Sequence, residues 1–145
     1  MTRSLLYGGA FAVLVLAATG PLMRRVPWLR WLAHEMRRML GPLDLSTVLV
    51  LALASGVAEE VFFRGALLPV VGLTASSLLF GLIHTGPDRR YVAWTAFTLV
   101  VGFALGWIVV ATGSLAGAVL AHVLINAVNL WRIGRLEVPE GFDDP

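Results

Sequence analysis

Long apolar runs with very few charges dominate the pattern of hydrophobic and polar positions in this chain. The first extends from Leu5 to about Leu22. Four more follow it, over Leu45 to Val70, Leu73 to Thr85, Tyr91 to Ala111 and Leu115 to Trp131. Because a bilayer crossing takes about 20 residues at about 1.5 Å rise, these runs predict an all-α, multi-span transmembrane bundle of about five helices. Breaks at Gly72, Gly86-Pro87-Asp88 and Thr112-Gly113 separate the later runs.

A different pattern lies between the first two runs, where apolar and basic residues alternate at helical spacing. Trp28 and Trp31 belong to its apolar positions, and Arg30 and Arg37 to its basic ones. This spacing predicts an amphipathic helix at the membrane interface, with arginines facing anionic headgroups. We therefore divide a single membrane-embedded domain, 1–145, into a first span (1–23), an interfacial helix (24–43), a core of spanning helices (44–131) and a polar tail (132–145).

The composition supports an integral membrane protein, since 58% of the residues are hydrophobic, 14% are charged and the mean hydropathy is +0.83. The lipid bilayer is therefore the expected environment. All eleven basic residues are arginines, and most flank apolar runs. Five spans with the N-terminus outside would put these flanking arginines on one side, the cytoplasmic side. Because the positive charge is explained by topology, we expect no nucleic-acid partner.

Polar residues interrupt the apolar runs at depths where a bilayer tolerates few of them. They are Glu59, Glu60, Arg64, His84, His122 and Asn126. Glu59, His84 and Asn126 each lie 12 residues from the nearest turn on the side opposite the arginines, roughly 18 Å at helical rise. His122 lies eight residues in, about 12 Å. Because three helices bring polar groups to nearly one level, the pattern favours a shared intramembrane site.

Helical spacing separates the two neighbouring carboxylates. Glu60 and Arg64 are four residues apart on one helix face, whereas Glu59 is rotated about 100° away. We expect Arg64 to neutralise Glu60 and to leave Glu59 free for chemistry. His122 and Asn126 form a second pair at this spacing and are expected to face one cavity with Glu59. The alternative is structural, with both carboxylates and the His122–Asn126 pair serving only to join helices.

The polar residues form three motifs that resemble, in order, those of the CPBP intramembrane proteases, a family that includes CAAX prenyl endopeptidases and Abi-type bacterial proteins. The motifs are Glu59-Glu60-x-x-x-Arg64, Phe80-x-x-x-His84 and His122-x-x-x-Asn126, and the resemblance covers about Leu45 to Trp131. It implies hydrolysis of a membrane-anchored or C-terminally processed protein in a bacterial cytoplasmic membrane. By the same resemblance Glu59 activates water with help from His84, while His122 and Asn126 stabilise the oxyanion.

Other chemistries remain open at this point. Glu59, His84 and His122 could instead hold a catalytic zinc ion. We favour the glutamate mechanism, without a cofactor, because no H-E-x-x-H motif is present and Asn126 is a poor zinc ligand. A small proton-coupled transporter would also carry Glu and His at the bilayer midplane. A non-catalytic membrane binding or immunity protein is the remaining alternative class.

Overall fold

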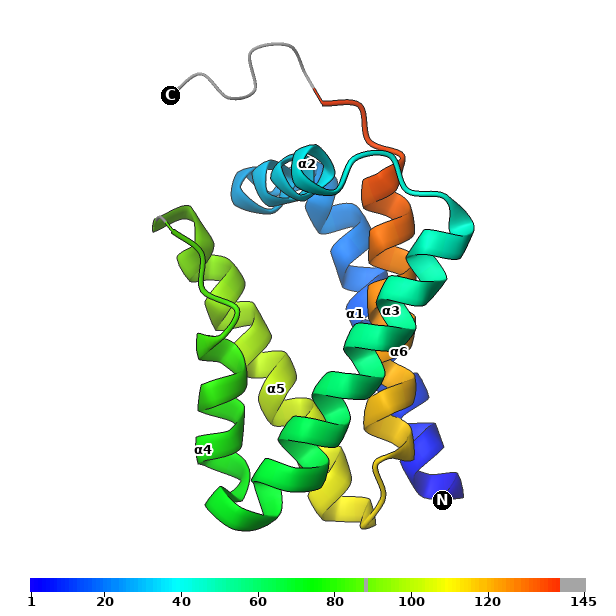
Figure 1. Cartoon of the computed structure of the whole chain (residues 1–145), viewed down its shortest axis with the longest axis vertical. Helices are drawn as coiled ribbons and strands as arrows, with labels where there is room; N and C mark the ends of the chain where they lie inside the picture. The colour runs from blue at the N-terminus through cyan, green and yellow to red at the C-terminus, as the bar shows by residue number, and fades with distance from the viewer. Residues whose placement is uncertain (88, 139–145) are drawn as a thin grey trace.

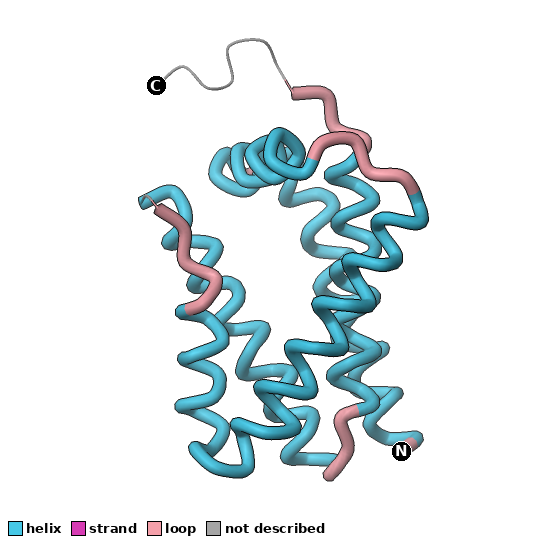
Figure 2. Tube along the Cα trace, viewed as in Figure 1, coloured by secondary structure: helices cyan, strands magenta, loops and turns pink. Residues whose placement is uncertain are grey.

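A computed structural model describes residues 1–87 and 89–138, and every regular element among them is a helix (Figures 1 and 2). The all-α prediction is therefore confirmed. The elements are α1 (Thr2–Arg25), α2 (Pro27–Leu40), α3 (Leu45–Glu60), the π-helical turn η1 (Val61–Leu67), α4 (Leu68–Leu82), the 3₁₀ turn η2 (Arg89–Tyr91), α5 (Val92–Thr112) and α6 (Ala116–Gly134).

Among the described residues, four helical stretches are long and apolar enough to cross a membrane. They are Thr2–Arg25, Leu45–Leu82, Arg89–Thr112 and Ala116–Gly134. The second stretch folds back on itself (Figure 1), because Gly72 adopts a φ of +81° that helical residues do not have. Its return leg from residue 73 to 82 is roughly 15 Å long, about half of the hydrocarbon core. The chain thus makes about five passes, as predicted, and the third is short.

The arginine-flanked ends of the helices gather at one end of the molecule. Figure 1 shows α2, the end of α1, the end of α6 and the α4–α5 connection there, opposite the N-terminus and the turns after α3 and α5. The second of these turns contains Gly113, whose φ is +65°. The predicted break at residues 86–88 is a loop at Gly86 and Pro87, and Asp88 lies outside the described residues. The predicted grouping of the arginines at one end therefore agrees with the fold.

The last helix extends slightly beyond the apolar run that predicts it. The polar tail was expected from residue 132, yet α6 continues through Gly134. Burial and hydrogen bonds stabilise the last turn of α6. Ile133 is only 4% exposed, and Arg132 Nη1 donates to the Leu16 carbonyl and to Thr19 Oγ1 of α1, both at 3.2 Å. The part of the tail from 139 to 145 lies outside the described residues.

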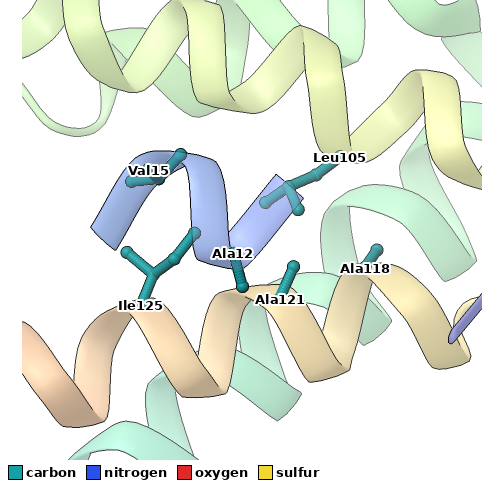
Figure 3. Close-up of a cluster of buried hydrophobic side chains, with 6 residues drawn as sticks. All are labelled: Ala12, Val15, Leu105, Ala118, Ala121 and Ile125. Carbon is teal, nitrogen blue, oxygen red and sulfur yellow. The ribbon is translucent and has the colours of Figure 1, made fainter. Parts of the chain in front are cut away.

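The packing places many apolar side chains outside and several polar ones inside, as expected of a protein in lipid. The buried polar residues are Ser4, Thr19, Glu60, Arg64, Ser76, Ser77, Thr98 and His122. A cluster of buried apolar side chains joins α1, α5 and α6 through Ala12, Val15, Leu105, Ala118, Ala121 and Ile125 (Figure 3). Three of these six side chains are alanines, and the helix backbones approach closely here. A Cβ atom on Gly8 would meet the Gly117 carbonyl of α6.

Three helix pairs make up most of the bundle: α6 packs against both α1 and α3, and α4 packs against α5. The amphipathic helix α2 covers one end of the bundle, with Leu29, Leu32 and Ala33 buried (Figure 1). Trp31 of α2 also packs edge-on against Tyr91 of η2, with 5.4 Å between the ring centres. The candidate site lies where residues of the α3–α6 pair meet residues of the α4–α5 pair.

Candidate functional site

The first motif lies where α3 changes into the π-helical turn η1. Asp44 caps the start of α3, because its carboxylate accepts the Thr47 N–H at 2.7 Å, and this bond holds the pKa of Asp44 below its ordinary value. At the other end of α3 the Leu68 N–H bonds to the Phe63 carbonyl, one residue further than in an α-helix. Ser76 Oγ donates to the same carbonyl at 2.8 Å and so ties the two legs of the folded stretch together. Such π-helical turns are frequent at functional sites.

Glu59 meets His84 across the two helix pairs. Glu59 Oε2 lies 3.6 Å from His84 Nε2, and the two side chains are 26% and 22% exposed. His84 Nδ1 lies 2.7 Å from the Phe80 carbonyl. A carbonyl oxygen only accepts hydrogen bonds, so Nδ1 carries a proton and, in neutral His84, Nε2 keeps a lone pair. With Glu59 ionised and His84 neutral, two hydrogen-bond acceptors, Glu59 Oε2 and His84 Nε2, therefore face each other.

Glu60, in contrast, is completely buried and serves two partners. Its Oε1 lies 2.8 Å from Arg64 Nη1 and 2.8 Å from His122 Nδ1. Arg64 also donates to the Gly102 carbonyl at 2.9 Å, and its guanidinium lies 4.2 Å from the centre of the Phe80 ring. The predicted Glu60–Arg64 pair is present. The sequence did not predict the second partner of Glu60, which α6 supplies by directing His122 Nδ1 to this carboxylate.

Phe80 connects the two imidazoles. The centre of its ring lies 4.7 Å from that of His84 and 6.0 Å from that of His122. The second motif therefore contributes in three ways: the Phe80 carbonyl orients His84, while the Phe80 ring packs against both histidines and under Arg64. Both histidines are thus packed against one aromatic side chain.

Asn126 has a partner that the motifs do not include. Its Nδ2 donates to Ser55 Oγ at 3.0 Å, and Ser55 Oγ donates to the Leu51 carbonyl at 2.8 Å. We expected Glu59, His84, His122 and Asn126 to face one cavity. In the structure, polar contacts of these residues form three pairs, Glu59–His84, Glu60–His122 and Ser55–Asn126. The sequence gives one indication that Ser55 belongs to the site: it lies four residues before Glu59 and so on the same face of the helix.

The zinc alternative needs three ligands around one point. Among the described residues, no group of three His, Cys, Asp or Glu side chains is arranged to hold a metal ion. Within the expected set, Glu59 meets His84, whereas His122 Nδ1 is turned to Glu60. The donor set in this geometry therefore does not fit a three-ligand zinc site.

The fold and the site define an integral membrane protein that holds carboxylates, imidazoles and a guanidinium inside its helical bundle. The chain belongs to the Rce1-like family of type II CAAX prenyl endopeptidases, whose family model matches residues 41–128 and so spans all three motifs. It is also 31% identical to YpbD of Bacillus subtilis strain 168, an uncharacterized protein, in an alignment that covers 87% of this chain and 67% of YpbD. No solved structure gives a significant match. Family membership supports a hydrolase of the intramembrane protease class.

Proposed function

We propose that the protein is an intramembrane endopeptidase in which Glu59 activates the water that attacks the peptide bond. The observation that carries the proposal is the approach of Glu59 Oε2 to His84 Nε2 at 3.6 Å, made by side chains from two different helix pairs. Glu59 Oε2 is buried and has no hydrogen-bond donor among the described residues. A buried carboxylate oxygen without a donor is costly unless a water molecule or a proton satisfies it.

The state of the two acceptor atoms explains why water would suit this space. Neutral His84 and ionised Glu59 cannot bond each other directly, because neither facing atom carries a hydrogen. A water molecule between them could donate one hydrogen to each and would be polarised by both. Glu59 would then take one proton as the water oxygen attacks the carbonyl carbon, and would return it to the leaving amine.

His122 and Asn126 are proposed to stabilise the negative charge on the carbonyl oxygen. The Asn126 carboxamide has two N–H hydrogens, and Ser55 uses one of them. His122 has its Nδ1 proton directed to Glu60, so it could donate to an oxyanion through Nε2 in its imidazolium form. The buried Glu60–Arg64 pair would hold that imidazole in place. Donors that are already oriented in a dry site act strongly on developing charge.

The proposed substrate is a membrane-anchored or C-terminally processed protein, and the proposed location is the cytoplasmic membrane of a bacterium. Two observations support a substrate that approaches within the membrane. The Glu59 and His84 side chains are about a quarter exposed, and many neighbouring apolar residues on the outside of the bundle, such as Phe62, are exposed as well.

A comparison of membrane proteomes tests the proposal. Cells that produce the wild-type protein are compared with cells that produce Glu59→Gln, which keeps the shape of the side chain but cannot take a proton from water. Glu35→Gln is the matched control, because Glu35 pairs with Arg38 on α2 and lies outside the site. We expect at least one membrane polypeptide to remain uncleaved in Glu59→Gln cells alone. Identical proteomes would favour a non-catalytic binding protein, and proton flux in liposomes would favour a transporter.

A further inference from the structure

The contact between Ser55 and Asn126 assigns a role to a residue outside the three motifs. Ser55 Oγ donates its hydrogen to the Leu51 carbonyl at 2.8 Å, so the same oxygen is left as an acceptor for Asn126 Nδ2 at 3.0 Å. If the carboxamide were turned over, its oxygen would compete with the Leu51 carbonyl for the one hydroxyl hydrogen. Ser55 therefore determines which way the Asn126 carboxamide faces.

The register of α3 against α6 makes this contact possible. A Cβ atom on Gly56 would lie 2.7 Å from Val123 Cγ2 and 3.0 Å from the Val123 nitrogen, so glycine is needed for the two helices to approach. Because the two helices are close, the short side chains of Ser55 and Asn126 can reach each other. Along the same interface, one turn further, Glu60 meets His122. The two α6 residues of the third motif are thus each held by one α3 residue.

We infer that Ser55 is a positioning residue for Asn126, and this inference rests on the proposed function of the site. With one amide hydrogen held by Ser55, the second is offered in a single orientation rather than through free rotation of the carboxamide. A preorganised donor stabilises an oxyanion more than one that must rotate into place. Loss of the Ser55 hydroxyl should slow the chemical step and leave substrate binding nearly unchanged.

The hydrogen bond itself can be tested without any substrate. The chain contains two asparagines, Asn126 and Asn129, so selective ¹⁵N-asparagine labelling gives two pairs of side-chain amide signals in NMR. Ser55→Ala should shift the Asn126 pair upfield, because a proton leaves a hydrogen bond. Asn129 serves as the internal control, since its Oδ1 accepts from Thr19 Oγ1 at the α1–α6 interface instead. Ser55→Thr keeps the hydroxyl and should restore the wild-type shift.

A double-mutant cycle tests the consequence for catalysis. The probe is a farnesylated peptide that ends in a CAAX sequence, presented in proteoliposomes. If wild-type protein leaves this peptide intact, the probe is the polypeptide that persists in Glu59→Gln cells. Ser55→Ala should lower kcat about 10- to 100-fold with KM nearly unchanged. In an Asn126→Ala background Ser55→Ala should cost nothing further, because both substitutions remove the same oriented donor.

The control variant is Thr112→Ala. Like Ser55, Thr112 donates its hydroxyl to the carbonyl four residues earlier, Ile108, at 2.6 Å, but it lies at the far end of α5. Its activity should stay at the wild-type level. Unchanged Asn126 signals in Ser55→Ala would overturn the inference, and so would full activity of Ser55→Ala beside an impaired Asn126→Ala. Full activity of Glu59→Gln would overturn the proposed function, and with it the role of Ser55.

Discussion

Removing the guanidinium of Arg64 is the sharpest test of how this bundle tolerates charge. Arg64 is 2% exposed and Glu60 is fully buried, and the two are joined at 2.8 Å. Arg64 also binds the Gly102 carbonyl and lies over the Phe80 ring. Arg64→Leu would therefore leave the Glu60 carboxylate inside the protein without its cation, with His122 as its remaining partner.

The size of the effect follows from burial. Removing one member of a buried ion pair costs about 3 to 5 kcal/mol, because the remaining charge stays unsolvated. This is a large share of the roughly 5 to 15 kcal/mol that stabilises a typical domain. It corresponds to an increase of about two to three and a half orders of magnitude in the unfolding constant.

Reversible unfolding in mixed detergent micelles, followed by tryptophan fluorescence, measures this free energy of unfolding. The matched control is Arg38→Leu, because Arg38 pairs with Glu35 at 2.7 Å, yet the Arg38 side chain is 46% exposed. The two pairs have nearly equal distances and differ in solvation, so the control should lose only about 0.2 to 1 kcal/mol. A loss in Arg64→Leu no larger than that in Arg38→Leu would refute the argument from burial.

Two further predictions concern helix packing and the metal question. Gly8→Ala should destabilise the protein by about 1 to 3 kcal/mol or more in the same unfolding assay, because its Cβ would meet backbone atoms of Gly117. Gly9→Ala, with open space at its Cβ, should be neutral or stabilise by up to about 1 kcal/mol, and equal losses in both variants would contradict the close approach. Chelation should leave the cleavage rate unchanged, and elemental analysis should find far less than one zinc per purified chain. Inactivation by the chelator with recovery on adding zinc would support the metal alternative.

Features that depend on local spacing could be predicted from the sequence. The apolar runs became helices, and the breaks at Gly72 and Gly113 are turns with positive φ. The Glu60–Arg64 pair follows from helical spacing, which is a property of one helix. Counting residues from the turns also put Glu59 and His84 at the same depth, and in the fold these two side chains meet.

Contacts that depend on helix rotation could not be predicted in this way. Depth along a helix says nothing about the direction in which a side chain points around the axis. The contact between His122 and Glu60 was not predicted for this reason, since it depends on how α6 is rotated. The π-helical turn at Val61–Leu67 is a second feature that regular α-helical spacing does not predict. It changes the direction around the helix axis in which the residues after it point. Ser55 was not predicted as a site residue because its partner, Asn126 of α6, lies 71 positions further along the chain.

The order of apolar and polar residues was therefore enough to determine that this is an all-α integral membrane protein and where its membrane-length helices lie. Those properties follow from hydrophobic transfer and from the constant rise of a helix, and both act along the chain. Which carboxylate meets which imidazole was decided by the tertiary structure alone. That choice rests on how closely α3 approaches α6 at Gly56 and how far each helix is rotated, and both depend on packing between distant segments.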